Sequence, residues 1–221
     1  MSIEREKELA AVAAAELVEP GMVVGLGSGS TVAYFLPALA ARGLDIQCVA
    51  TSLETARRGR ELGLSVDDFS GPGARARLDI AIDGADQVTR SGWLVKGGGG
   101  AHTREKAVAA AADRFVVIVS SEKLVERIGP PIPLELMAFG LAGTLYRMPE
   151  VRLRDAPPSP DGGVIADFIG AFDDPEVLAA RLCGSVGVVE HGLFPPTMVS
   201  EVVIAQGERV ERFAVGTTDR V

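Results

Sequence analysis

The stretch LDIAIDGAD, residues 78–86, indicates which fold this 221-residue chain adopts. Its first five residues are mostly apolar, as expected of a buried strand, and the apolar run stops at Asp83. Asp83 and Asp86 therefore follow the carboxyl end of a parallel strand. In open α/β sheets, ligands bind in the crevice beyond these strand ends. The stretch predicts a parallel sheet with a carboxylate site at its carboxyl edge.

A glycine-rich segment, KGGGGAHTREK at residues 96–106, indicates further site residues. It follows an expected strand at 93–95 and leads into alanine-rich residues 103–112, which favour a helix with Glu105 in its first turn. Taken alone, a Gly-Gly turn or a glutamate at a helix start is ordinary local chemistry. Four consecutive glycines exceed what a turn needs, because each costs roughly 0.5–1 kcal/mol relative to alanine in regular structure. Lys96, Glu105 and the glycine N–H groups are therefore candidate site groups.

A third segment, GLGSGST at residues 25–31, predicts an anion site. It lies between an expected strand at 22–24 and an expected helix at 32–41, whose free N–H groups and positive dipole end suit a phosphate. The spacing is G-x-G-x-G instead of the G-x-G-x-x-G of dinucleotide folds, and the next expected strand, 46–50, does not end in an acidic residue. No Gly-Lys-Ser/Thr follows, so the segment is not a P-loop.

Together these motifs resemble the A-type ribose-5-phosphate isomerases. Lys7 ahead of a Pro-Gly pair, TSLET at 51–55, Lys123 in SSEKLVE and the segment 187–194 extend the resemblance over almost the whole chain. The resemblance implies interconversion of D-ribose 5-phosphate and D-ribulose 5-phosphate in the non-oxidative pentose phosphate pathway. It also implies that no cofactor takes part and that the protein forms a homodimer or homotetramer.

The resemblance further implies roles for the candidate residues. Glu105 would be the proton-transferring base, while Asp83, Asp86 and Lys96 would assist ring opening and stabilise an enediolate. Such an intermediate carries negative charge that is absent from the ground state, which Lys96 and glycine N–H groups can hold. The sequence does not decide which of the two aspartates opens the sugar ring. The substrate-binding candidates, several of them for the phosphate, are Lys7, Ser28, Gly29, Ser30, Thr31, Gly84, Ala85, Gly97, Gly98, Gly99 and Lys123.

Two other functions remain open. A sugar-phosphate-binding regulatory module would keep the anion loop and need no base, but it would normally carry a basic DNA-reading helix, which this sequence lacks. Another sugar-phosphate enzyme on the same scaffold, such as a deaminase or lactonase, would need different catalytic groups around the loop. Formation of a ketose from ribose 5-phosphate alone distinguishes these functions.

Composition excludes several classes of partner. A formal net charge of −8 argues against nucleic acid and against an anionic membrane surface. The uncharged residues 21–41 contain four glycines and a proline, which favours strand, loop and helix over a membrane span. The charged residues 4–8 do not fit a signal peptide, so we expect a cytoplasmic protein. The two cysteines and two histidines show no metal-binding spacing, and no metal site is expected.

The order of expected elements predicts an α/β fold with two parts. After a helix at 2–18, strands near 22–25, 46–50, 78–82 and 115–120 alternate with helices, which indicates a doubly wound, mostly parallel sheet. From residue 130 the order becomes β-α-β-β-α-β, with helices at 137–148 and 174–182, which is typical of a ferredoxin-like α+β unit. Strands at 199–205 and 212–215 would return to the first sheet. We therefore expect a Rossmann-like catalytic domain of residues 1–129 with 199–221, and a small domain of residues 130–198.

Overall fold

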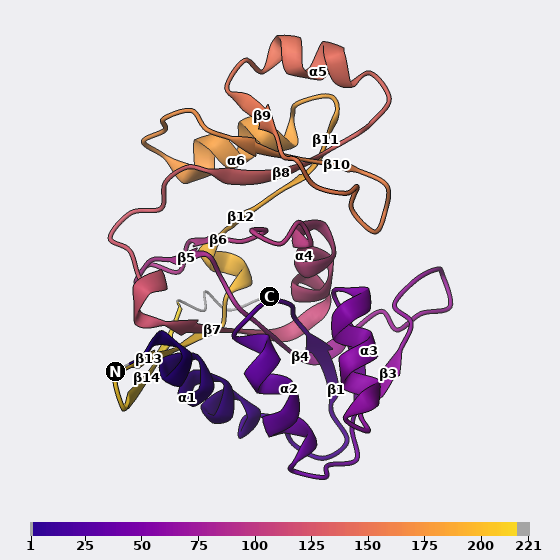
Figure 1. Ribbon diagram of the computed structural model, residues 1–221, viewed down its shortest axis with the longest axis vertical. Coiled ribbons are helices and arrows are strands. Elements are labelled where there is room, and N and C mark those ends of the chain that lie inside the picture. Colours follow the sequence, from indigo (N-terminus) through magenta and orange to yellow (C-terminus); the bar gives the residue numbers. More distant parts are fainter. Residues whose placement is uncertain (1, 216–221) are drawn as a thin grey trace.

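Short apolar strands separated by helices build a central seven-stranded sheet in the computed structural model, which describes residues 2–215. The strand order is β14-β13-β7-β4-β1-β2-β3, and every neighbouring pair is parallel except β13 with β14. This sheet forms the lower part of the molecule in Figure 1. Its strands are β1 (Val23–Leu26), β2 (Gln47–Ala50), β3 (Ser65–Asp67), β4 (Leu78–Asp83), β7 (Ala112–Ser120), β13 (Glu201–Gln206) and β14 (Arg209–Ala214).

Helices cover both faces of this sheet, as a doubly wound fold requires. Alternate residues of a strand point to opposite faces, so Ile80 and Ile82 join one apolar core while Ala81 between them joins the other. The first core also receives side chains of α1 (Ile3–Ala15), α2 (Val32–Ala40) and α3 (Leu53–Glu61). The second core receives those of α4 (His102–Ala111). The expected α/β class with a mostly parallel sheet is confirmed.

A separate three-stranded antiparallel sheet lies between the two parts of the molecule (Figure 1). It consists of β5 (Gln87–Val88), β6 (Leu94–Val95) and β12 (Leu193–Phe194). The strand expected at 93–95 is therefore β6, but it does not belong to the parallel sheet. Lys96 follows its end and so approaches the site from above the carboxyl edge.

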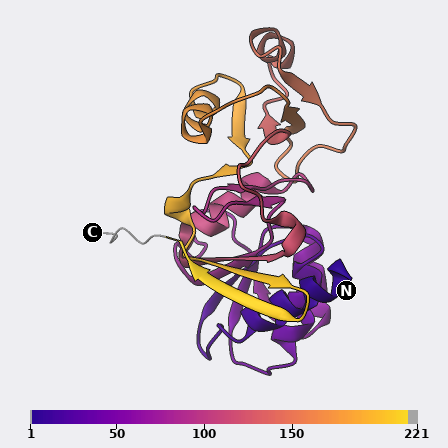
Figure 2. The same cartoon turned by 90° about the vertical axis from the view of Figure 1, so that its left-hand side faces the viewer.

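Another antiparallel sheet, of four strands and called the small sheet below, forms the upper part of the molecule, as the side view in Figure 2 shows. Its order is β11-β8-β10-β9, and each neighbouring pair is antiparallel, as in a split β-α-β unit. The elements are β8 (Ile132–Leu136), α5 (Leu141–Arg147), β9 (Val151–Leu153), β10 (Val164–Phe168), α6 (Pro175–Cys183) and β11 (Val188–His191). The ferredoxin-like order expected from residue 130 onward is therefore present.

Some expected element bounds were wrong. The first helix ends at Ala15 instead of 18, and the helix expected from 137 begins at Leu141, because Gly140 before it has a positive φ of 75° that breaks the helical path. Short 3-10 turns occupy Ser121–Lys123 (η1) and Pro196–Met198 (η2). We propose the division into domains at 129/130 and 198/199. Residues 1 and 216–221 of the first proposed domain lie outside the described residues.

A membrane-crossing helix would need a long apolar segment. Among residues 2–215, no helix is both long and apolar enough to cross a membrane.

Candidate functional site

The strand order places the candidate site beside β1 and β4. From β1 the sheet continues to β2 and β3, and from β4 it continues in the opposite direction to β7 and β13, so a crevice opens where the order diverges. A cavity of about 140 Å³ lies there. It is lined by Ser28, Gly29, Ser30, Thr31, Gly84, Ala85, Asp86, Lys96, Gly97, Gly98, Gly99, Glu105 and Lys123.

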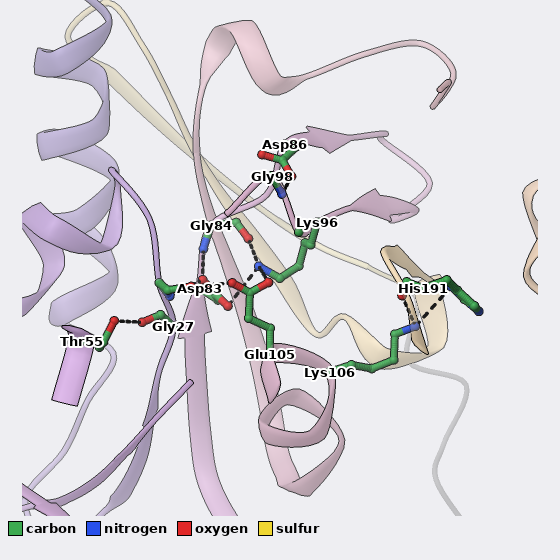
Figure 3. Close-up of polar contacts among 12 residues, drawn as sticks. Gly27, Thr55, Asp83, Gly84, Asp86, Lys96, Gly98, Glu105, Lys106 and His191 are labelled. Atoms are coloured by element: carbon green, nitrogen blue, oxygen red, sulfur yellow. Dashed lines mark hydrogen bonds and ion pairs between the residues drawn. The ribbon is translucent and has the colours of Figure 1, made fainter. Parts of the chain in front are cut away.

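Asp83, Lys96 and Glu105 form a buried charged cluster (Figure 3). Lys96 Nζ lies 3.0 Å from Asp83 Oδ2 and 3.3 Å from Glu105 Oε2, and none of the three side chains is more than 7% exposed. Lys96 Nζ also donates to the carbonyl oxygen of Gly84 at 2.6 Å. Burying a charge is costly unless it is paired, so each member of this cluster depends on the others.

Burial and mutual charge shift the titration of this cluster. Burial disfavours the charged form of Asp83 and raises its pKa to about 7, while the Lys96 ammonium opposes this shift and Glu105 adds to it. Burial by itself would lower the pKa of Lys96, but the charges of Asp83 and Glu105 outweigh it, so that pKa is raised. Lys96 therefore stays protonated at neutral pH.

Asp83 also holds the loop after β1 against the end of β4. The backbone N–H groups of Ser28 and Gly84 donate to Asp83 Oδ1 at 2.9 and 2.7 Å. A Cβ atom at Gly27 would lie 2.1 Å from the same oxygen, so any side chain there would displace the carboxylate. Asp83 is consequently engaged by the protein on all sides, and it does not line the cavity.

The loop after β1 reaches the first turn of α4. Ser28 Oγ donates to Glu105 Oε1 at 2.5 Å, which joins the predicted anion loop to the predicted base. Gly29 has a φ of +98°, a conformation open to glycine and strained for other residues. Lys123 in η1 lines the same cavity. Its Nζ lies 3.4 Å from Glu122 Oε1, and its side chain is 35% exposed. The loop, a cation and the candidate base thus surround one small space.

Asp86 and the glycine segment form another wall of the cavity. The N–H group of Gly98 donates to Asp86 Oδ2 at 2.8 Å, as Figure 3 shows. Gly97 and Gly100 have positive φ angles of 105° and 77°, which explains why this turn is built from glycine. Asp86 therefore faces the cavity, whereas Asp83 lies behind Lys96.

All but two of the residues predicted from sequence line this cavity. Asp83 belongs to the buried cluster but does not line the cavity, and Lys7 is not among the lining residues, its Nζ lying 2.7 Å from Glu4 Oε1. Sequence reasoning did not identify Arg154, which donates to the carbonyl oxygens of Gly97 and Gly98 at 2.9 Å each. No local motif marks Arg154, because its contact with the segment joins parts of the chain 56 and 57 residues apart.

One group of metal-ligating types, Cys183, Glu190 and His191, lies outside this cavity, with ligand atoms within 4.8 Å of one another. The Leu193 N–H donates to His191 Nδ1 at 3.2 Å, so the neutral ring carries its proton on Nε2, which lies 3.2 Å from Cys183 Sγ. Lys106 Nζ lies 2.7 Å from Glu190 Oε1. These contacts satisfy the group without an ion, and the expectation that no metal takes part stays a prediction.

The chain is similar in sequence to known enzymes over most of its length. The family model of ribose 5-phosphate isomerase A (phosphoriboisomerase A) matches residues 47–209. A ribose-5-phosphate isomerase A of Caulobacter vibrioides is 43% identical in an alignment 231 positions long, which covers 96% of this chain and 99% of the relative. One of Halobacterium salinarum is 44% identical over 208 residues, covering 87% of this chain and 88% of the relative.

Solved structures share the fold. Ribose 5-phosphate isomerase A of Neisseria gonorrhoeae superposes with a TM-score of 0.91 at 28% identity, covering 98% of this chain and 99% of that one. The enzyme of Methanocaldococcus jannaschii gives 0.88 at 33% identity, covering 96% and 100%. A D-ribose-5-phosphate isomerase in complex with phospho-erythronic acid gives 0.88 at 30% identity, covering 97% and 100%.

Proposed function

The chain belongs to the ribose 5-phosphate isomerase A family, a family of aldose–ketose isomerases, and from this premise we propose that it interconverts D-ribose 5-phosphate and D-ribulose 5-phosphate through an enediolate. The observation that carries the proposal is the Asp83–Lys96–Glu105 cluster beside a cavity that also meets the anion loop. It combines a candidate base with a fixed cation, as proton transfer next to a carbonyl requires.

We assign the phosphate to the loop 28–31 and Lys123. The backbone N–H groups at the start of α2 and a lysine ammonium attract an anion. The relative solved with phospho-erythronic acid supports a phosphate ligand in this fold. Lys7 was expected here as well, but its ion pair with Glu4 makes it the weaker candidate.

We assign ring opening to Asp86. Both Asp83 and Asp86 were candidates, but only Asp86 among these two lines the cavity, and its Oδ2 accepts one hydrogen bond from Gly98. Asp83 instead holds Lys96 at 3.0 Å and accepts two backbone N–H groups. Its proposed role is to keep the ammonium charged and in place.

Glu105 is the proposed base for the proton transfer. It removes the proton at C2 of the open-chain aldose, the electron pair forms the C1–C2 double bond, and the C1 carbonyl oxygen becomes an oxyanion. The O2 hydroxyl proton then passes to O1, and the protonated Glu105 returns its proton to C1, which leaves the carbonyl at C2. Lys96 and the N–H groups of the glycine segment other than that of Gly98, which is bonded to Asp86, balance the oxyanion charge.

The direct test is to incubate the protein with ribose 5-phosphate and follow ketose formation, with and without EDTA. We expect turnover in both cases, because the proposed groups need no metal; loss of activity with EDTA that a divalent ion restores would contradict the metal-free mechanism. Release of ammonia from an amino-sugar phosphate with no ketose from ribose 5-phosphate would instead favour a deaminase.

The base is tested with Glu105→Gln, which keeps the shape of the side chain but cannot take a proton. We expect kcat to fall by roughly 10²–10⁴ with KM little changed. The matched control is Glu176→Gln, which changes an exposed first-turn glutamate of α6. A stable Glu105→Gln protein with normal turnover would rule out this assignment.

A homodimer or homotetramer is also proposed. Phe139 and Tyr146 of the small sheet's α5 region are each 89% exposed, which favours burial against a further copy. Mass measurement in solution tests this. A cytoplasmic location and a place in the non-oxidative pentose phosphate pathway stay predictions.

A further inference from the structure

We propose that Arg154 and Asp167 form a positioning pair, which holds the glycine segment 97–99 from the small sheet so that the Gly98 N–H group orients Asp86 and the Gly99 N–H group faces the substrate. This inference rests on the proposed function, because it concerns the wall of the same cavity. Neither residue lines that cavity, so both would act through the segment.

The Arg154 guanidinium uses all three of its nitrogens. Nε and Nη2 donate to the two carboxylate oxygens of Asp167 at 2.7 and 2.6 Å, in a bidentate arrangement. Nη1 donates to the carbonyl oxygens of Gly97 and Gly98, both at 2.9 Å. The hydrogen bond and charge of Asp167 raise the pKa of Arg154 despite partial burial, so the guanidinium stays charged. A planar fork that binds a carboxylate along one edge leaves its remaining nitrogen in a defined place.

The small sheet sets where this fork lies. Asp167 is in β10, where it pairs with Arg152 of β9, and Arg154 directly extends that pairing through a backbone hydrogen bond to Ile165 at 3.0 Å. The side chains of Arg154 and Asp167 are 20% and 19% exposed, which limits screening of their charges by water. Backbone pairing within the small sheet therefore anchors both residues independently of their contact with the glycine segment.

The two carbonyl contacts decide which way the segment's N–H groups point. In a trans peptide the carbonyl and the following N–H point in opposite directions. Because the Gly97 carbonyl points to Arg154, the N–H of Gly98 points away from it, and this N–H donates to Asp86 Oδ2. The Gly98 carbonyl contact turns the N–H of Gly99 away from Arg154 in the same manner.

The segment needs such an external support because of its composition. Glycine has more backbone freedom than any other residue, so a run of four loses most entropy when it is ordered. The Gly97 carbonyl also accepts the N–H of Gly100 at 3.0 Å within the turn. Without Arg154 the Gly98 carbonyl could turn toward the cavity, where it would repel a phosphate or an oxyanion. Arg154 binds both carbonyls from the opposite side and so stabilises the orientation that suits an anionic intermediate.

The test compares Arg154→Met, Asp167→Asn and the double variant with wild type. We expect Arg154→Met to lower kcat by roughly ten- to a hundredfold, with KM rising less, because small misplacements of site groups have effects of this size. Asp167 acts through Arg154, so the double variant should be no slower than Arg154→Met. The matched control is Arg90→Met, which removes another bidentate arginine–carboxylate pair, with Glu211, on the exposed surface.

A second measurement separates positioning from stability. Millimolar ethylguanidinium should restore part of the turnover of Arg154→Ala, and ethylammonium should not, because only a guanidinium can bridge Asp167 and both carbonyls. Amide hydrogen exchange of residues 98–100 should be faster in Arg154→Met than in wild type and unchanged in Arg90→Met.

Turnover and exchange of Arg154→Met equal to those of Arg90→Met would overturn the inference. A double variant much slower than Arg154→Met would also contradict it, since Asp167 would then act independently. If wild type forms no ketose, the proposed function fails, while the exchange comparison still decides whether Arg154 orders the segment.

Discussion

The carboxyl edge of the central sheet and the small antiparallel sheet contribute differently to the site. The edge and the loops next to it hold the charged groups that can do chemistry, Asp83, Lys96 and Glu105. The small sheet holds residues that contact the chain between those groups: Arg154 binds the Gly97 and Gly98 carbonyls, and Glu135 accepts from Thr103 at the start of α4. The comparison indicates that one region supplies reactivity and the other supplies orientation.

After Glu105→Gln, the largest loss of turnover should follow removal of the central cation. Lys96→Met leaves two buried carboxylates without a cationic partner, so we expect kcat to fall by roughly 10²–10³ and the free energy of unfolding by about 3–5 kcal/mol. Lys106→Met is the control, because Lys106 also forms a partly buried pair, with Glu190, outside the cavity. The turnover and the thermal unfolding of both variants are measured. An equal loss of turnover in the two would contradict the different roles given to the two regions.

A smaller effect is expected at the phosphate. Lys123→Ala should raise KM about tenfold, since loss of a charge-assisted hydrogen bond of about 1.5–3 kcal/mol weakens binding, and kcat should change little. Lys7→Ala is the comparison, because Lys7 pairs with Glu4 and is not among the residues that line the cavity. Steady-state kinetics of both variants with ribose 5-phosphate, and with ribose as the substrate that lacks the phosphate, give the two KM values. An unchanged KM for ribose 5-phosphate in Lys123→Ala would contradict the assignment of Lys123 to the phosphate site.

A smaller loss of turnover is expected from a substitution in the small sheet. Glu135 is buried and accepts hydrogen bonds from Thr103 Oγ1 and, at 2.5 Å, from Ser159 Oγ. Glu135→Gln should lower kcat less than tenfold and the stability by about 1–3 kcal/mol, because the amide cannot accept both bonds equally well. A fall in kcat as large as that of Lys96→Met would show that Glu135 has more than an orienting role.

The buried cluster should also make stability depend on pH. Burial raises the pKa of Asp83 from an ordinary 3.8 to about 7, so between these values the folded protein binds a proton that the unfolded chain does not. The contribution of this group to stability therefore increases as pH falls from about 7 toward 4, by at most about 1.4 kcal/mol per pH unit. Unfolding of wild type and Asp83→Asn from pH 8 to 5 measures this, with Asp113→Asn, an exposed partner of Arg77, as control. Parallel curves for all three would contradict a raised pKa.

Much of the site could be predicted from sequence because its groups lie in short motifs with local structural causes. Asp83 and Asp86 follow a strand end, Glu105 lies in a helix first turn, and the loop 25–31 precedes a helix. The alternation of strands and helices likewise indicated the mostly parallel sheet, because hydrophobic periodicity is set within each element.

Other features depended on contacts between distant parts of the chain. No local signal marks the different environments of Asp83 and Asp86, the pairing of β6 outside the parallel sheet or the role proposed for Arg154. A sequence motif determines which groups a segment carries and the local conformation it favours. Which of those groups is buried, and which distant side chain holds it, is decided by long-range packing, because burial and charge pairing exist only once the chain has folded.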